Sequence, residues 1–379
     1  MSVVLLFGRA PSQRDVSRFG LDVLARSFET SIYDVSPLLR GPLEQVSEDR
    51  GAEAVAVEKL KNFSEIVDRL SGRRPNLIID ALPPGSLRER LRIACRRQAI
   101  SVVVHPIGPL PPLPDQPFRT RLAERFPKSP SQALRTIRLL RDSMIRSRGP
   151  SPDVFISAGD SSLRRTDALS AARIIHGRSF DCDEYERSRE LSDLPAAFDV
   201  FVDSGGPLHP DYDYLGFRRS ALPNDYFSVL KNFLSTAEQT TGRPVLIARH
   251  PRMKNVPYQD FLPEFEIFDD VTASLIQKST AVFDTGSTAT SFSVLAHKQV
   301  FYLTPGALPG SAEWRLATGI ARSLGREAST TTEQFVNDLR RAEEIPFHTF
   351  DSYRREYLFS DLSSRRSFAE EITSLLREE

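Results

Sequence analysis

Short apolar segments rich in β-branched residues recur along the chain, each bounded by turn residues, and this pattern is typical of buried strands. In the first half, the predicted strands are Val3–Phe7, Thr30–Asp34, Asn76–Asp80, Ser101–His105, Asp153–Ser157 and Arg173–His176. In the second half, they are Phe198–Asp203, Pro244–Arg249, Phe265–Phe268, Ala281–Asp284 and Gln299–Leu303. Segments with helical periodicity separate them. This alternation favours an α/β protein whose parallel sheets are covered by helices on both faces.

Two of the predicted helices carry recognisable start signals. Ser86 precedes Glu89 by the spacing of a capping box, and Ser129 is followed by Pro130 at the first helical position and by Gln132 at the third. The other predicted helices are Glu53–Leu70, Asp225–Thr241, Val271–Lys278, Thr288–His297, Ser311–Leu324, Thr332–Arg341 and Ser363–Leu376.

The length of 379 residues fits two ordinary domains. We expect two Rossmann-like, doubly wound α/β domains that face each other and are joined near Glu184–Pro195. The first spans residues 1–190, the second spans residues 191–360, and a C-terminal helix in residues 361–379 crosses back to the first. No internal repeat is visible, which excludes a solenoid.

Charge and composition exclude several other classes. The 50 basic and 50 acidic residues balance, so no global charge favours nucleic acid. No segment approaches the roughly 20 apolar residues of a membrane span, and the N-terminus lacks the basic region of a secretory signal. Cys95 and Cys182 are the only cysteines, which excludes a disulfide framework and an all-cysteine zinc site. A reducing cytoplasm is the expected compartment.

The residues that best predict chemistry follow two strands of the second domain. One group is Arg249, His250, Pro251 and Arg252, and the other is Thr285, Gly286, Ser287 and Thr288. Both groups follow strand C-termini, where open α/β sheets bind ligands. The glycine turn is expected to leave backbone N–H groups free at a helix N-terminus, with hydroxyls beside them, and histidine and arginine supply charged donors. Together they predict a phosphate-binding site.

These residues carry a resemblance to a known family. His250-Pro251 and Ser287-Thr288 resemble the His-Pro and Ser/Thr-Ser/Thr motifs of bacterial GT-B glycosyltransferases of surface-polysaccharide synthesis. The branch most similar uses CMP-activated acidic sugars such as sialic acid and Kdo. The resemblance implies that the second domain binds the nucleotide donor and that the first binds a glycan acceptor. CDP-polyol phosphotransferases of wall polymers use a similar pair, so the donor stays open.

The general base is a separate question, because a transferase of the inverting type needs a group to accept the acceptor's proton. Asp80, His105 and Asp160 follow predicted strands of the first domain, and Asp160 lies in a glycine turn that could lift its carboxylate into a cleft. A helix-capping role is the structural alternative for Asp160. His209 and Asp211 follow the first strand of the second domain, where we expect contacts to the donor sugar or the acceptor.

We expect no metal and no cofactor apart from the nucleotide-sugar substrate. Asp181 and Asp183 form the Asp-x-Asp pattern that binds metal in the other glycosyltransferase fold. A site built from helix N-termini and cations stabilises a leaving phosphate without metal.

Two further segments have more than one interpretation. Residues 106–117 contain six prolines, which predicts either a stiff surface connection, a wall of the binding cleft or, less readily, a proline-rich peptide ligand. Residues 131–148 predict an amphipathic helix with a basic face, which suits either ordinary packing or contact with an anionic membrane surface.

The sequence therefore predicts a metal-independent glycosyltransferase whose partners are a nucleotide-activated sugar and a glycan or lipid-linked glycan acceptor. Peripheral contact with the inner face of the plasma membrane and partner glycosyltransferases are further expectations. The competing hypotheses are a polyol-phosphate transferase, a nucleotide-sugar epimerase, and a transferase-like subunit that binds glycan without catalysis.

Overall fold

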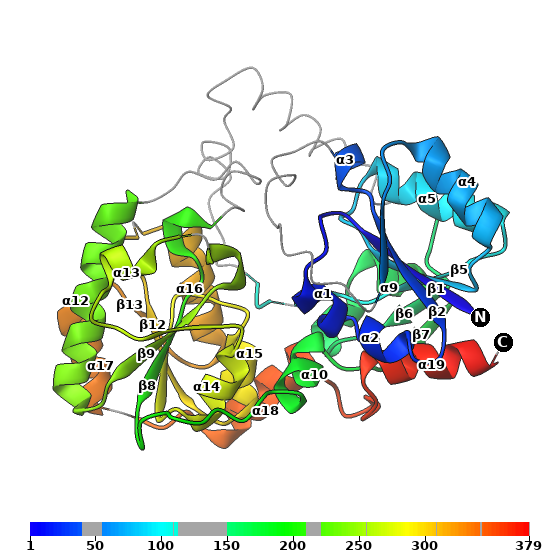
Figure 1. Cartoon of the computed structure of the whole chain (residues 1–379). Coiled ribbons are helices and arrows are strands. Elements are labelled where there is room, and N and C mark those ends of the chain that lie inside the picture. The colour runs from blue at the N-terminus through cyan, green and yellow to red at the C-terminus, as the bar shows by residue number, and fades with distance from the viewer. Residues whose placement is uncertain are drawn as a thin grey trace. The chain divides into compact units, whose positions relative to one another are not determined.

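The computed structural model describes residues 1–39, 55–108, 110–112, 150–209, 221–254, 256–307, 309–341 and 343–378 (Figure 1). The chain divides into two compact units. The first unit contains the described residues of 1–109, 127–183 and 355–379, and the second contains those of 110–126 and 184–354. Each unit is an α/β structure built on one parallel sheet.

The described part of the first unit has a sheet in the order β3-β2-β1-β4-β5-β6-β7, and every pair is parallel. The strands are β1 (Ser2–Phe7), β2 (Glu29–Asp34), β3 (Ala56–Lys59), β4 (Leu77–Ala81), β5 (Ser101–Val104), β6 (Val154–Ile156) and β7 (Arg173–Ile175). Side chains of β1 alternate between two buried clusters, with Val3 and Leu5 in one and Val4 and Leu6 in the other. The sheet is therefore covered on both faces, as the apolar segments predict.

The helices of the first unit follow its strands. They are α1 (Gln13–Arg18), α2 (Leu21–Leu24), α3 (Ser36–Leu39), α4 (Phe63–Arg73), α5 (Ser86–Arg97), α8 (Asp160–Leu163), α9 (Thr166–Ser170), α10 (Phe180–Glu186, which crosses into the second unit) and α19 (Phe368–Glu378). A π-helical turn at Arg354–Leu358 carries the chain back from the second unit.

The C-terminal helix α19 is part of the first unit's core. Phe368, Ile372 and Leu376 are buried in the same cluster as β1. The backbone N–H of Phe368 donates to Asp183 Oδ2 at 2.9 Å, so this carboxylate satisfies an orphan donor where the helix begins. Asp181 pairs with Arg18 at 3.1 Å. The Asp-x-Asp sequence thus joins α10 to its neighbours through hydrogen bonds and ion pairs.

The described part of the second unit has a parallel sheet in the order β10-β9-β8-β11-β12-β13. Its strands are β8 (Asp199–Val202), β9 (Val245–Arg249), β10 (Ile267–Asp269), β11 (Ala281–Asp284), β12 (Gln299–Leu303) and β13 (Ala328–Ser329). Its helices are η2 (Gly206–Leu208), α12 (Pro223–Thr241), η3 (Pro251–Met253), α13 (Tyr258–Phe261), α14 (Thr272–Lys278), α15 (Thr290–Leu295), α16 (Ala312–Ser323), α17 (Thr332–Arg341) and α18 (Phe347–Tyr353).

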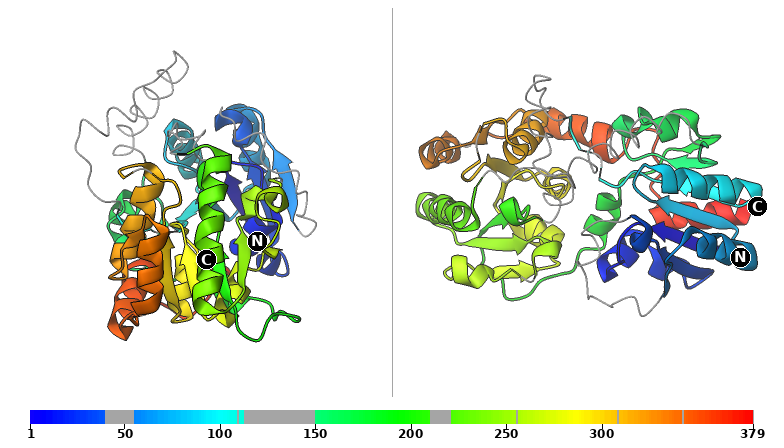
Figure 2. Two further views of the ribbon diagram at one scale, coloured as in Figure 1. Left: turned by 90° about the vertical axis from the view of Figure 1, so that its left-hand side faces the viewer. Right: turned by 90° about the horizontal axis from the view of Figure 1, so that it is seen from above.

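Aromatic packing fixes the helices on one face of this sheet. Phe233 of α12 and Phe283 of β11 both contact Phe335 of α17, with ring centroids 5.6 and 5.3 Å apart. Figure 2 shows α12 and α17 as neighbouring helices, and α14 lies on the other face in Figure 1. No helix in the described ranges is long and apolar enough to cross a membrane.

The structure corrects the prediction of one helix over Glu53–Leu70. Residues Ala56–Lys59 form strand β3, which pairs with β2, and α4 begins only at Phe63. Asn62 caps α4, since its Oδ1 accepts from the N–H of Glu65 at 2.8 Å. Sheet pairing outweighs the helical periodicity of this segment.

Several other expectations differ or fall outside the described residues. Helix α5 begins at Ser86 as predicted, but its N-cap is Gly85 and no side chain caps it, so the predicted capping box of Ser86 and Glu89 does not form. Strand β13 and helix α18 were not predicted. The helix from Ser129, the basic helix of residues 131–148 and most of the proline-rich segment lie outside the described residues.

Candidate functional site

The candidate site lies at the point of the second sheet where the strand order reverses. The chain runs outward from β8 to β9 and β10, and then returns to place β11 on the other side of β8. The C-terminal ends of β8 and β11 therefore lie side by side with loops that diverge, which is where open α/β sheets bind ligands. Both predicted groups flank this point, His250 after β9 and Ser287 after β11.

Two histidines, in the loops that follow two different strands, lie close together at this edge. The rings of His209, which follows η2, and His250 are 4.7 Å apart in an edge-to-face arrangement. His250 Nδ1 accepts a hydrogen bond from the backbone N–H of Arg252 at 3.2 Å. The proton of a neutral His250 ring therefore lies on Nε2, which becomes a hydrogen-bond donor.

Asp203, at the end of β8, holds the histidine loop in place. This buried carboxylate accepts from Tyr258 Oη at 2.6 Å, from the N–H of Gly205 at 2.8 Å and from the N–H of His250 at 3.2 Å. Burial raises the pKa of Asp203, although these hydrogen bonds oppose the shift. Asp203 thus joins the loops after β8 and β9 and is not itself exposed to a ligand.

Asp284, at the end of β11, likewise holds the turn that follows it, and its contacts correct one expectation. Its Oδ1 accepts from the N–H groups of Gly286 at 2.7 Å and Ser287 at 2.6 Å, and its Oδ2 accepts from Thr290 Oγ1 at 2.7 Å. The N–H groups that were expected to be free for a phosphate are therefore occupied. Burial raises the pKa of Asp284 to about 6.

The polar groups that this turn presents are hydroxyls. Thr288 is exposed and Ser287 is half-buried, and Ser287 Oγ accepts from the N–H of Ala289 at 3.1 Å. Thr285 is buried and hydrogen-bonds Ser204 of the β8 loop, with 2.6 Å between the two hydroxyl oxygens. This bond links the two sides of the switch point.

Glycines allow the close packing of these loops. Gly286 has φ +97°, and a Cβ there would lie 2.8 Å from the backbone nitrogen of Ala317 in α16. Gly206 has φ +46°, and its Cβ would lie 2.5 Å from the ring of Tyr226. A side chain at either position is strained both by conformation and by contact.

The two arginines beside His250 differ in what they contact. Arg249 forms a two-pronged ion pair with Asp269, with Nε–Oδ1 at 2.8 Å and Nη2–Oδ2 at 2.5 Å, and this raises its pKa. Arg249 is therefore a structural residue more than a phosphate ligand. Arg252 is half-buried in η3, next to His250. Asp211, also predicted here, lies outside the described residues.

Two of the three base candidates in the first unit are structural. Asp80 Oδ2 accepts from Arg88 Nε at 2.7 Å and from Arg92 Nε at 2.8 Å. His105 is buried, its ring stacks on Phe180 with centroids 4.2 Å apart, and burial lowers its pKa to about 3. A base must be accessible and ionisable, so neither fits that role.

Asp160 differs from both. It is the first residue of α8, it is half-buried, and its carboxylate has no hydrogen-bond partner among the described residues. The capping role does not apply, because the N-cap is Gly159. Gly159, with φ +74°, packs so closely that a Cβ would lie 2.6 Å from the carbonyl oxygen of Glu356.

Sequence reasoning did not assign Ser204 or Tyr226 to the site. The place of Ser204 depends on which strands are neighbours, because Ser204 lies beside Thr285 only when β8 pairs with β11. The glycine pair Gly205-Gly206 directly after a strand was the available signal.

Comparison with known proteins identifies the overall fold. The sequence matches no family profile and no curated protein. The structure resembles a spinosyn rhamnosyltransferase complexed with thymidine diphosphate (13% identity, 99% of each chain covered, TM-score 0.55). The chain has a GT-B fold. The same GT-B architecture is found in a glycosyltransferase of kitacinnamycin (10% identity, 100% and 98% covered, TM-score 0.56) and in a putative UDP-N-acetylglucosamine 2-epimerase from Listeria monocytogenes (12% identity, 100% and 96% covered, TM-score 0.53). At these identities the likeness shows the fold alone.

Proposed function

We propose that the protein is a glycosyltransferase that moves a sugar from a nucleotide-activated donor to a hydroxyl of a glycan acceptor. The carrying observation is the cluster at the switch point of the second unit, where His250 Nε2, His209 and the hydroxyls of Ser287 and Thr288 lie on loops of one sheet edge. Solved structures with this fold include a spinosyn rhamnosyltransferase complexed with thymidine diphosphate, which supports a nucleotide as the ligand.

The chemistry needs a proton acceptor and a stabilised leaving group. The acceptor oxygen forms a bond to the anomeric carbon, and the bond between that carbon and the donor phosphate breaks, with its electron pair leaving on the phosphate. His250 Nε2–H and the nearby hydroxyls donate hydrogen bonds to the phosphate oxygens as negative charge develops. Arg252 adds positive charge on the same loop.

Asp160 is our assignment for the base that takes the acceptor's proton. Its support is an unpartnered, half-buried carboxylate after a strand end, judged over the described residues. Asp160→Asn removes the basic oxygen with little change in size. We expect kcat to fall by about 10²-fold or more with donor affinity unchanged. Unchanged kcat in a folded Asp160→Asn protein would remove this assignment.

The donor we favour is a CMP-linked acidic sugar in surface-polysaccharide synthesis, by resemblance of the His250-Pro251 and Ser287-Thr288 motifs. One phosphate needs one set of donors, and Arg252, two residues after His250, is our candidate partner for the sugar carboxylate. Titration of CMP, CDP, UDP and TDP at one ionic strength tests this. UDP or TDP binding at least about tenfold tighter than CMP, a gap of about 1.4 kcal/mol, would assign the protein to the diphosphate users.

An epimerase is the second candidate, because the Listeria monocytogenes structure has the same fold and similar coverage. Product analysis separates the two functions. A transferase releases nucleotide and forms a glycoside only when an acceptor is present. An epimerase converts the nucleotide-sugar without any acceptor.

A further inference from the structure

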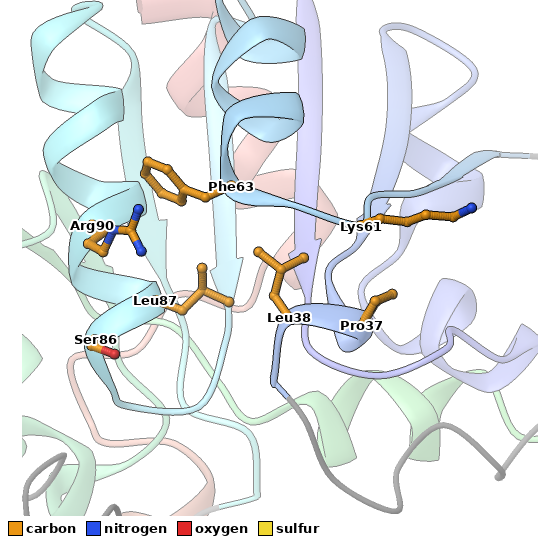
Figure 3. Close-up of a pocket in the computed structure, with 7 residues that line it drawn as sticks. All are labelled: Pro37, Leu38, Lys61, Phe63, Ser86, Leu87 and Arg90. Carbon is orange, nitrogen blue, oxygen red and sulfur yellow. The ribbon is translucent and has the colours of Figure 1, made fainter.

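A hollow of about 340 Å³ is lined entirely by residues of the first unit. Its walls come from the segments that directly follow β2, β3 and β4, so it lies at the carboxyl edge of the first sheet (Figure 3). The volume is within the range of small-molecule sites, which begins at about 300 Å³.

Three apolar side chains line part of this hollow, whose exposed lining is more polar than apolar. Leu38, Phe63 and Leu87 line it and pack on the buried cluster between the sheet and helices α4 and α5. Figure 3 shows the three side chains gathered between the two helices and α3. A small ring or a short hydrocarbon would bury apolar surface against them.

Arg90 supplies a charged group that forms no ion pair among the described residues. Its neighbours Arg88 and Arg92 on α5 are buried in ion pairs with Asp80 and Asp167. The guanidinium of Arg90 lies over the ring of Phe63, 3.9 Å from its centroid, and pairs with no carboxylate among the described residues. The aromatic contact orients the planar fork, whose N–H groups suit a carboxylate or a phosphate.

The rest of the lining has the same sign of charge. Lys61 stands at the opposite rim, where its side chain extends away from Arg90 in Figure 3, and it has no acidic partner in the described ranges. Its backbone N–H donates to Glu65 Oε2 at 2.9 Å, so that carboxylate is directed to the start of α4. The described lining contains two cations and no acid.

We propose that this hollow binds an anionic group of the acceptor, a carboxylate or phosphate carried on a small and partly apolar body. Arg90 pairs with the anion, and Leu38, Phe63 and Leu87 contact the body that carries it. This inference rests on the proposed function, because only that function makes the ligand an acceptor. Binding of the anion to the hollow does not depend on the donor site.

Calorimetric titration of the full chain with four probes tests the proposal. Glucuronic acid and glucose share a ring and differ in the carboxylate, and geranyl phosphate and geraniol share a chain and differ in the phosphate. We expect at least one charged probe to bind about tenfold or more tightly than its neutral analogue. Binding of the uronate indicates an acidic sugar, and binding of geranyl phosphate indicates a lipid-linked acceptor.

Two variants of α5 localise the effect. Arg90→Gln should weaken binding of the charged probe by about tenfold, a change in binding free energy of about 1.4 kcal/mol. Arg97→Gln is the matched control, because Arg97 is exposed on the same helix and does not line the hollow. Equal weakening by both variants, equal binding of charged and neutral probes, or no binding below about 10 mM would overturn the proposal.

Failure of this proposal is distinguishable from failure of the proposed function. Nucleotide affinity should be the same in Arg90→Gln and wild type, since the nucleotide cluster belongs to the other unit. Nucleotide binding without probe binding contradicts only the proposal that the hollow binds an anion. Probe binding without nucleotide binding contradicts the transferase assignment and still supports anion binding in the hollow.

Discussion

Replacing the buried carboxyl of Asp284 by an amide should change how the stability of the second unit depends on pH. In the unfolded chain this carboxyl has a pKa near 3.8, and burial raises its pKa to about 6 in the folded protein. Between those values the unfolded form has lost its proton while the folded form keeps it. The free energy of unfolding therefore falls as pH rises from about 4 to about 6, and the loss is complete above about pH 6.

The size of the effect follows from the two pKa values. A difference of about 2 units corresponds to about 3 kcal/mol of stability lost at neutral pH. Asp284→Asn has no ionisable group. Its Oδ1 can still accept from the N–H groups of Gly286 and Ser287, and its amide nitrogen can donate to Thr290 Oγ1, which in turn can donate to Tyr302 Oη at 3.1 Å.

Denaturant unfolding at about pH 4.5 and pH 7.5 measures this difference, and other groups cancel between wild type and variant. Trp314 of α16 is the only tryptophan in the sequence, so its fluorescence reports on the second unit. Between the two pH values, the unfolding free energy of the variant should rise by about 2 kcal/mol relative to that of wild type. Asp260→Asn, at an exposed site of α13, is the control and should gain little. An equal difference in unfolding free energy between variant and wild type at both pH values would refute the reasoning.

Three further predictions concern the same unit. Activity should survive EDTA, because hydrogen-bond donors and arginine stabilise the leaving phosphate, and loss on chelation with rescue by magnesium or manganese would contradict this. Gly286→Ala should lower the unfolding free energy by about 1–3 kcal/mol through strain at φ +97° and contact with Ala317, measured by the same fluorescence assay; wild-type stability would contradict the contact. Arg249→Gln should leave nucleotide affinity within about twofold of wild type, because the ion pair with Asp269 already engages Arg249, and a tenfold loss would return Arg249 to the phosphate site.

Much of the fold could be predicted from sequence because most of the strands are continuous apolar runs. Strands such as Ala281–Asp284 and Gln299–Leu303 were predicted at their observed bounds. Segment 56–59 was missed since its charged residues Glu58 and Lys59 do not mark a buried strand. It becomes β3 only through its pairing with β2 at the sheet edge.

The candidate site could be predicted in outline but not in its contacts. The sequence indicates that polar groups follow strand ends, which places His250 and Ser287 at one edge. It does not indicate that Asp203 and Asp284 fold back to accept the N–H groups two residues later. Such turns depend on burial and on neighbouring strands, and for that reason the N–H groups of the glycine turn were wrongly expected to be free.

The central claim is that a donor nucleotide binds by its phosphate beside His250. Calorimetric titration of CMP, CDP, UDP and TDP into wild type, His250→Ala and His348→Ala tests this most directly. His348 is exposed on α18 and is the matched histidine control. We predict that the best nucleotide binds wild type and the control alike, and that His250→Ala weakens it by about tenfold or more, as expected for a hydrogen bond to a charged phosphate. Equal affinity in all three proteins, or no binding of any of the four nucleotides, would contradict the account.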